Sequence, residues 1–391
     1  MRKFNQFGFW ILIIFFSTGC GIFNSDSNSS PKGDIVFVAL QGLDQVGMVN
    51  TDTGDIEAIE INFETMDMQM GEMSMGEQTP HFIAIDNANG YWFVTTIMSG
   101  FVGRYDLNTN TLIDKVAVGD LPALMVLNSQ NKKLYVSRMM PMTGMTGSES
   151  TFIQEIDYSN PDSMVIEYEY SIGSPAPHGM GINSIGSEVY TASNTADWFF
   201  KINTDTGGIE ETPLEEGYSQ DKLDPIARLK PIQVLSLEDS LVMITCSGGK
   251  WTDGTIEKEI PGLIQLWNTN SMTLIDTLQL SWKSSPWHIT ASPNSQIIYT
   301  TLRGDPDYPG SAGVLAISYE MESLSIFAEN YSEKFESLHG IDISSDGESL
   351  YVSGMRDGHL HHFKTTDLQL IQSIPLGDLN SFPQPGGIKV K

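Results

Sequence analysis

Short apolar strands recur along the chain, and each lies within the same succession of alternating hydrophobic and polar positions. The recurring strand reads FVAL, FVTT, YVSR, YTAS, MITC, YTTL and YVSG, starting at residues 37, 93, 135, 190, 243, 299 and 351. A shorter apolar strand precedes most copies, and two alternating strands with Asn, Asp, Gly and Ser turns follow. Side chains alternate between the two faces of a strand, so the pattern predicts four antiparallel strands in each repeat. Seven such repeats are typical of a seven-bladed β-propeller.

The two ends of the chain each carry part of one repeat. The first repeat begins at DIVFVALQ, residues 34–41, and lacks a preceding strand, whereas the final PQPGGIKVK, residues 383–391, has the pattern of a first strand without a partner. Pairing the two would leave no open sheet edge. We therefore predict an all-β, seven-bladed β-propeller over residues 34–391, with four antiparallel strands per blade and a C-terminal strand that completes blade one.

Two segments carry a family resemblance. SLHGIDISSDGESLYVSG at 337–354 and TTDLQLIQSIPLG at 365–377 resemble the repeats of the bacterial YVTN-type seven-bladed propellers. The similarity extends over nearly all of the chain after the first 33 residues. The resemblance implies the fold but no particular activity, because propellers serve as enzymes, receptors and scaffolds.

The N-terminus has the features of an export signal. Arg2 and Lys3 precede an apolar run from Phe7 to Phe16, and Ser17-Thr18-Gly19-Cys20 follows. This resembles the bacterial lipoprotein signal, in which the cysteine is lipidated and becomes the first mature residue. The resemblance implies a signal peptide at 1–19, a lipidated Cys20 with a flexible Ser/Asn linker at 20–33, and an exported protein anchored to a bacterial membrane, the outer membrane or a periplasm-facing one. A plain secretory signal is the alternative.

Charge and cysteine content exclude several classes of protein. The formal charge of −28 argues against a nucleic-acid partner, because phosphate binding requires a basic surface. The chain has two cysteines, Cys20 and Cys246, so lipidation of Cys20 would leave no intramolecular disulfide. Cys246 lies in an apolar strand pattern, which favours a buried thiol over a ligand.

Nearly all long insertions belong to one face of the predicted ring. Connections from a fourth strand to the next first strand, and from second to third strands, share a face. Those connections contain residues 62–79, 138–150, 213–229, 247–262 and 303–313, whereas the other connections are uniformly short. Long loops in a compact domain are usually functional or disordered, and five on one face make it the predicted functional face.

Three histidines occupy the same register position at the start of innermost strands. His81, His178 and His339 belong to blades two, four and seven, and the innermost strands line the central channel, so their side chains are predicted to converge at its mouth. His288 is offset by one residue, and we expect it to point elsewhere. The alternative for all of these histidines is a structural hydrogen bond to a neighbouring blade. His359, His361 and His362 fall on an outer strand, which favours a position on a blade surface.

Methionines concentrate in two insertions of the same face. The stretch MDMQMGEMSMGEQTPH and the blade-three insertion contain Met66, Met68, Met70, Met73, Met75, Met139, Met140, Met142 and Met145. Thioether and imidazole ligands together select copper, Cu(I) especially, and the spacing resembles the methionine-rich motifs of exported copper-handling proteins. A methionine-rich protein-binding surface and a sink for oxidants are the competing interpretations.

The leading hypothesis is a lipid-anchored, non-catalytic envelope propeller that binds copper through these methionines and through His81, His178 and His339. The first alternative is a metal-free scaffold for an envelope protein or a glycan. The second is a mononuclear metal enzyme at the channel mouth, since this region is similar to the propeller of nitrous oxide reductase. The chain has fewer histidines in position than that enzyme's copper cluster needs and no cysteine-rich electron-entry domain, so the enzymatic alternative stays the weaker one.

Overall fold

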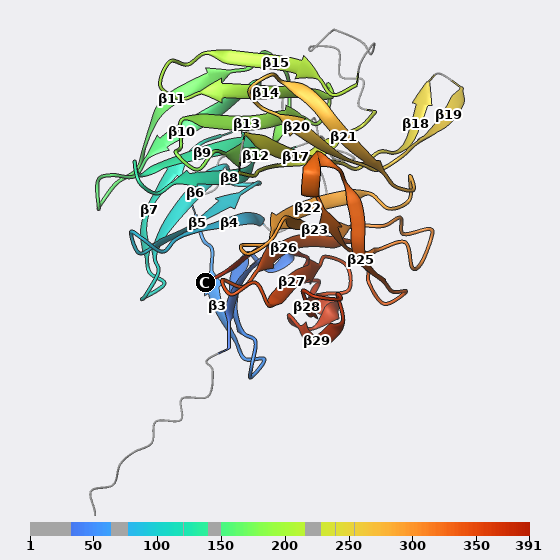
Figure 1. The fold of residues 1–391 in the computed structure, drawn as a ribbon. Helices are drawn as coiled ribbons and strands as arrows, with labels where there is room; N and C mark the ends of the chain where they lie inside the picture. The colour runs from blue at the N-terminus through green and yellow to red at the C-terminus, as the bar shows by residue number, and fades with distance from the viewer. Residues whose placement is uncertain are drawn as a thin grey trace, which may run out of the picture. The chain divides into compact units, whose positions relative to one another are not determined.

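Seven four-stranded antiparallel sheets are arranged as blades around a common axis (Figure 1). The structure is a computed structural model, and it describes residues 33–63, 77–119, 121–139, 150–215, 228–238, 240–253 and 255–391. Innermost strands contact one another in cyclic order, so blade one meets blade seven as well as blade two. The prediction of an all-β, seven-bladed β-propeller is confirmed.

Each blade has the strand order that the sequence pattern predicts, from the axis outward. Blade one contains β30 (Pro385–Val390), β1 (Ile35–Leu40), β2 (Gln45–Asn50) and β3 (Ile56–Glu60). Blade two contains β4 (Pro80–Asp86), β5 (Tyr91–Thr96), β6 (Phe101–Asp106) and β7 (Leu112–Ala117). Blade three contains β8 (Pro122–Asn128), β9 (Lys133–Arg138), β10 (Phe152–Asp157) and β11 (Val165–Ser171). Blade four contains β12 (Pro177–Ile182), β13 (Glu188–Ser193), β14 (Trp198–Asn203) and β15 (Ile209–Pro213).

Blade five differs by a hairpin inserted between its second and third strands. It contains β16 (Pro231–Ser236), β17 (Leu241–Cys246), β20 (Leu263–Asn268) and β21 (Thr273–Gln279), and the hairpin is β18 (Gly249–Asp253) with β19 (Ile256–Ile260). Blade six contains β22 (Pro286–Ala291), β23 (Ile297–Leu302), β24 (Gly313–Ser318) and β25 (Ser325–Tyr331). Blade seven contains β26 (Leu338–Ile343), β27 (Ser349–Gly354), β28 (His359–Lys364) and β29 (Leu370–Pro375). Three 3-10 turns, η1 (Gln41–Leu43), η2 (Glu320–Glu322) and η3 (Leu379–Ser381), complete the described elements.

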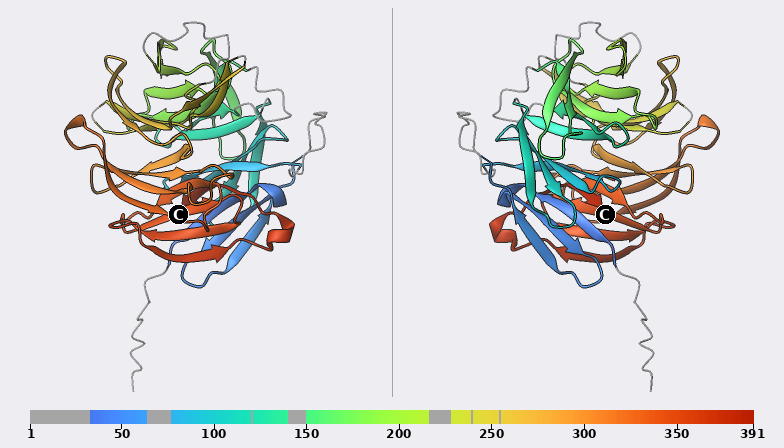
Figure 2. Two further views of the ribbon diagram at one scale, coloured as in Figure 1. Left: turned by 90° about the vertical axis from the view of Figure 1, so that its right-hand side faces the viewer. Right: turned by 90° about the vertical axis from the view of Figure 1, so that its left-hand side faces the viewer.

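The last strand of the chain closes the ring. β30 pairs antiparallel with β1, and Val36 lies opposite Val390 in this pairing. The blue strands of blade one and the red C-terminal strands lie side by side in both views of Figure 2. Lys389 adds an ion pair of 3.1 Å to Asp342 of blade seven. Blade one is therefore assembled from both ends of the chain, as predicted, and its innermost strand also contacts blades two and seven.

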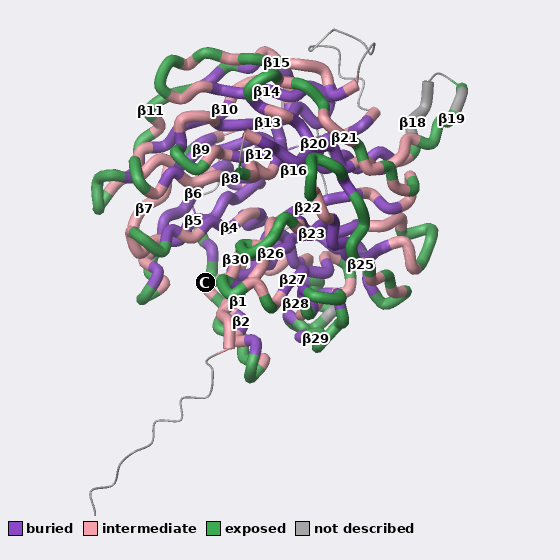
Figure 3. The backbone as a smooth tube through the Cα atoms, viewed as in Figure 1, coloured by how far each residue is buried: buried purple, intermediate pink, exposed green. Residues whose placement is uncertain are grey.

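The apolar residues of the described chain form seven clusters, and each cluster lies between two neighbouring blades. The cluster between blades one and two contains Phe37 and Trp92, whose ring centroids are 5.6 Å apart. The cluster between blades seven and one contains Val36 and Leu360. In Figure 3 the inner strands are buried, whereas most residues of the fourth strands, such as β11 and β21, are exposed or intermediate. Each blade thus depends on both neighbours for its core, which couples their folding.

The two kinds of connection that the sequence analysis assigned to one face lie side by side in the structure. In each blade, the loop after the second strand donates a backbone hydrogen bond to the segment that enters the first strand, as Ile97 N does to Thr79 O at 3.0 Å. The same bond recurs between Asn194 and Ala176 and between Arg303 and Ser285. We call this side of the ring, where the innermost strands begin, the loop face.

Two aspartates, the buried Asp197 and the half-buried Asp44, connect neighbouring blades on the loop face. Asp197, in the loop between β13 and β14, accepts backbone hydrogen bonds from Arg228, Leu229 and Lys230 at 2.8–3.0 Å. Asp44 of blade one accepts three equivalent bonds from residues 77–79, which enter blade two. Both aspartates adopt a left-handed backbone conformation, which Asp and Asn tolerate better than most residues.

Substitution of Asp197 by Asn should lower the free energy of unfolding by about 2 kcal/mol, because an amide keeps one acceptor oxygen and turns its NH2 group toward backbone N–H donors. Chemical denaturation of both proteins measures the difference. Asp205→Asn, on an exposed turn of the same blade, is the matched control and should change stability by less than about 0.5 kcal/mol. Equal effects of the two substitutions would contradict the assigned role of Asp197.

Candidate functional site: a buried histidine cluster on the axis

Four histidine rings meet where the innermost strands begin. The centroid of the His81 ring lies 6.5 Å from that of His178 and 5.5 Å from that of His339. The His288 ring lies 4.6 Å from the His339 ring. Their exposed fractions are 1–3%. The structure therefore brings the three histidines of the sequence register together, and we call His81, His178, His288 and His339 the histidine cluster.

His288 belongs to the cluster, contrary to the expectation that its offset would direct it elsewhere. The register between β22 and β23 shifts between Pro286 and Ile289, so two residues leave the regular ladder. Strand alternation fails across such a bulge. As a result, Trp287 and His288 are both buried and both contact the ring of His339, at 5.7 and 4.6 Å. Equivalent shifts follow the first residue of every other innermost strand.

The backbone at the channel mouth repeats in all seven blades. The residue before each innermost strand has a positive φ of 46–57°, at Thr79, Leu121, Ala176, Lys230, Ser285, Ser337 and Gln384. After the turn, a proline begins six of the seven strands. Gly179 and Gly340 follow two of the cluster histidines, and a Cβ at either position would lie within 3 Å of the next innermost strand. The Pro-His-Gly sequence is thus explained by a turn, an axial side chain and a close strand contact.

Two cluster histidines also make hydrogen bonds to neighbouring blades. His178 Nδ1 lies 2.6 Å from the carbonyl oxygen of Ile232 in blade five, so its Nδ1–H donates and its Nε2 carries a lone pair. Gln41 of blade one donates from Nε2 to His81 Nδ1 at 3.1 Å. The structural alternative recognised in the sequence, a bond to an adjacent blade, is therefore present for these two residues.

Each ring of the cluster retains one buried nitrogen without a hydrogen-bond partner. These atoms are His81 Nε2, His178 Nε2, His288 Nε2 and His339 Nδ1. A buried polar atom without a partner costs on the order of 1–3 kcal/mol, and native proteins contain few of them. Four in one cluster indicate a site at which the protein gives up stability.

Burial keeps the four rings uncharged. Desolvation, with a smaller contribution from His178, lowers the pKa of His81 to about 3. Desolvation lowers the pKa of His178 to about 4, although the bond to Ile232 opposes the change. The pKa values of His288 and His339 lie well below the ordinary value, first because of burial and then because of the neighbouring histidines. At neutral pH every ring is an imidazole with one lone pair.

The cluster does not have the arrangement of a preformed metal centre. Among the described residues, no group of three or more His, Cys, Asp or Glu side chains is positioned to hold a metal ion. The donor set is nevertheless suitable, because neutral imidazole is a common ligand of copper and zinc. The histidine rings would have to rotate about their χ2 torsions, or the side-chain amide of Gln41 would have to turn over, before the unpartnered nitrogens could point toward one position.

Most of the predicted methionine ligands lie outside the described residues, as does Cys20. They are Met66, Met68, Met70, Met73, Met75, Met140, Met142 and Met145. Met139 is described and is 5% exposed, in the apolar cluster between blades three and four. Cys246 is a buried free thiol whose pKa is raised by burial, in agreement with the sequence.

The remaining histidines lie on β28, as predicted. His361 contacts Asp357 at 3.2 Å, and His362 is hydrogen-bonded to Ser349 at 3.0 Å. In the part of the chain that the structure describes, no helix is long and apolar enough to cross a membrane.

Comparisons with known proteins identify the fold alone. A protein of unknown function from Desulfotomaculum acetoxidans has a TM-score of 0.64 at 12% identity, over 92% of this chain and 99% of that chain. A chain of the mitotic checkpoint complex has a TM-score of 0.62 at 17% identity, over 85% and 87%. Hydrazine synthase from Kuenenia stuttgartiensis has a TM-score of 0.61 at 14% sequence identity, over 85% of this chain and 98% of that chain. No family model and no curated protein matches the chain, so the YVTN-type and nitrous oxide reductase resemblances stay predictions.

Proposed function

We propose that this propeller is a non-catalytic, lipid-anchored protein of the bacterial envelope that binds copper at the histidine cluster. The observation that carries the proposal is the convergence of four buried, uncharged imidazoles, each with a ring nitrogen that has no partner. A bound cation would satisfy several of these nitrogens at once, which offsets the cost of burying them.

His178 is the ligand best prepared for this role. Its Nδ1–H is fixed by the carbonyl of Ile232, which leaves the Nε2 lone pair available, as in many metal sites. His81 would become equivalent if the amide of Gln41 turned over, because Nδ1 of His81 would then donate to the amide oxygen. His288 and His339 supply further ring nitrogens, and the centroids of these two rings are 4.6 Å apart.

Copper is favoured over zinc by the sequence rather than by the cluster. Imidazole suits both metals, whereas thioether selects Cu(I). In the sequence, the methionine-rich stretch 66–75 and Met139, Met140, Met142 and Met145 belong to connections of the loop face, and we propose that these methionines, apart from the buried Met139, capture the ion. The lipid anchor at Cys20 follows from the lipoprotein-like signal and would keep the protein at a membrane surface.

A metal-free scaffold is the second candidate. The bonds of His178 to blade five and of His81 to blade one favour it, because they would let the cluster act only as a contact between blades. In that case the long loops would bind an envelope protein or a glycan.

Cu(I) competition with a chromogenic chelator separates the two candidates. The full-length protein should retain copper, and the double variant His178→Gln/His288→Gln should bind it at least about tenfold more weakly, because two imidazole donors are lost. His362→Gln, on β28, is the control and should leave the affinity unchanged. Replacement of all five methionines in residues 66–75 by Leu should weaken the binding of a second class of copper ions, those held by this stretch. Failure of the parent protein to retain copper, or full retention by the double variant, would support the scaffold.

A further inference from the structure

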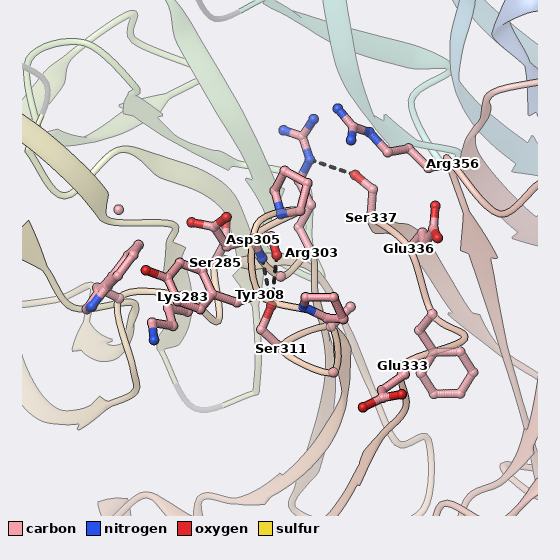
Figure 4. A pocket seen from close by; sticks show the side chains of 18 residues that line it. Lys283, Ser285, Arg303, Asp305, Tyr308, Ser311, Glu333, Glu336, Ser337 and Arg356 are labelled. Carbon is pink, nitrogen blue, oxygen red and sulfur yellow. Dashed lines mark hydrogen bonds between the residues drawn. The ribbon is translucent and has the colours of Figure 1, made fainter.

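A cavity of about 350 Å³ opens on the loop face between blades six and seven (Figure 4). Its walls come from four connections of that face, at 282–285, 303–312, 333–337 and 356, together with Gly249 at the base of the inserted hairpin. Its volume lies at the lower end of the range for small-molecule sites. None of the four cluster histidines lines it, although Arg303 of the cavity packs on Trp287, whose ring centroid lies 5.7 Å from that of His339.

Two arginines form one side of the cavity. Arg303 donates from Nε to Ser337 Oγ at 2.9 Å, and its guanidinium lies 4.6 Å above the ring of Trp287. These contacts fix the guanidinium and leave its terminal amino groups for another partner. The Arg356 side chain projects toward Arg303 in Figure 4, and burial together with this neighbouring charge lowers the pKa of Arg303. No carboxylate of the described residues lies within 4.0 Å of either guanidinium.

The acidic residues of the cavity do not neutralise this arginine pair. Asp305 is part of the folded loop, where its carboxylate accepts from Asp307 N at 2.9 Å and its backbone bonds to Ser311 Oγ. Glu333 and Glu336 are exposed. Two adjacent guanidinium groups without a carboxylate partner are unusual in a chain with a formal charge of −28. A guanidinium with free terminal N–H groups can bind a carboxylate, sulfate or phosphate through two parallel hydrogen bonds.

The opposite side of the cavity is aromatic. The rings of Trp282 and Tyr308 are 5.4 Å apart and nearly perpendicular, and Lys283 Nζ lies 3.6 Å from the centroid of the Tyr308 ring. Tyr308 is 39% exposed, so part of its ring is accessible to a ligand. Aromatic walls of this kind bind the flat face of another ring or of a sugar.

We propose that this cavity binds a small organic oxyanion whose charged group meets Arg303 and Arg356 and whose ring packs on Trp282 and Tyr308. The ligand class is therefore a ring-bearing carboxylate, such as a sugar acid or an aromatic acid. The proposal does not depend on copper binding at the histidine cluster.

Calorimetric titration of the full-length protein with paired probes tests the assignment. Methyl β-D-glucuronide or benzoate should bind with a dissociation constant below about 1 mM. The neutral counterparts, methyl β-D-glucoside and benzamide, should bind at least about tenfold more weakly, because they lack the group that pairs with the arginines. Inorganic phosphate should bind more weakly than the better of the two ring-bearing acids, since it makes no contact with the aromatic wall.

Variants locate the binding. Arg303→Met and Arg356→Met keep the aliphatic stem and remove the charge. Each should weaken the binding of the acid probe at least about tenfold. Lys115→Met, in blade two, is the matched control and should have no effect. Melting curves confirm that the variants fold. Absence of binding by both acids, equal binding of charged and neutral probes, phosphate binding as tight as that of the acids, or unchanged binding by both arginine variants would overturn the proposal.

Discussion

Lowering the pH from 7.5 to 5.5 should reduce the free energy of unfolding of the metal-free protein by about 5 kcal/mol. In the folded state the pKa of His81 is about 3 and that of His178 about 4, and those of His288 and His339 are also strongly lowered, chiefly by burial. In the unfolded chain these groups titrate near 6.5. The unfolded state therefore binds about four more protons than the folded state at pH 5.5, so stability is lost as the pH falls through 6.5. Each proton contributes about 1.4 kcal/mol per pH unit.

Denaturant titrations at several pH values measure this slope. The double variant His81→Gln/His339→Gln should show about half the slope of the parent, whatever its absolute stability, because two of the four protons are removed. Asn270→Gln, on the exposed turn between β20 and β21, removes no titrating group and is the control, which should leave the slope unchanged. Two other groups act in the same range: burial raises the pKa of Asp197, which opposes this slope, and burial lowers the pKa of His362, which adds to it. A stability that does not change between pH 7.5 and 5.5 would contradict the burial of four uncharged histidines.

Deletion of residues 385–391 should abolish the cooperative unfolding transition. The deletion removes β30, the innermost strand of blade one, and with it the ladder to β1 and the contacts with β4 and β26. It also exposes the edge of β1 and removes the partner of Asp342. Because blade one shares its core with two neighbours, the loss should approach the total stability of a typical domain, about 5–15 kcal/mol. Differential scanning calorimetry of the full-length and truncated proteins measures it.

A point substitution tests the same closure without a truncation. A Cβ at Gly387 would lie 2.6 Å from the backbone oxygen of His81, so Gly387→Ala should cost about 2 kcal/mol through strain between blades one and two. Gly208→Ala, on the β14–β15 turn, meets only Thr206 Oγ1 at 3.2 Å and is the matched control. A truncated protein that melts within about 2 °C of the parent would show that β30 does not close the ring.

Repetition made the fold predictable from the sequence. One strand pattern in seven copies defines seven blades even though each copy alone is weak, and the incomplete first and last repeats predict that β30 joins β1. The same register predicts that His81, His178 and His339 converge. His288 was missed because a bulge after Pro286 breaks the two-residue alternation on which register arguments depend. A proline precedes the bulge in six of the seven blades, but the bulge itself is seen only in the pairing of the strands.

The cavity between blades six and seven could not be derived from the repeats. Trp282, Arg303, Tyr308 and Arg356 lie in connections of different length and sequence, where no register relates one blade to the next. The sequence predicted the face, because the long insertions share it, but not which loops enclose a space. Pairing in loops depends on their individual conformations, as in the turn that the Asp305–Ser311 bonds stabilise.

Copper K-edge X-ray absorption spectroscopy of the copper-loaded, full-length protein tests the central claim most directly. Imidazole rings give a characteristic multiple-scattering pattern, which a thioether sulfur does not. Binding at the histidine cluster predicts nitrogen ligands with this imidazole pattern, and predicts that the pattern is weaker in His178→Gln/His288→Gln, which keeps only two of the four imidazoles. A spectrum with sulfur ligands alone, or one that is identical in the parent and the double variant, would contradict copper binding on the axis of the propeller.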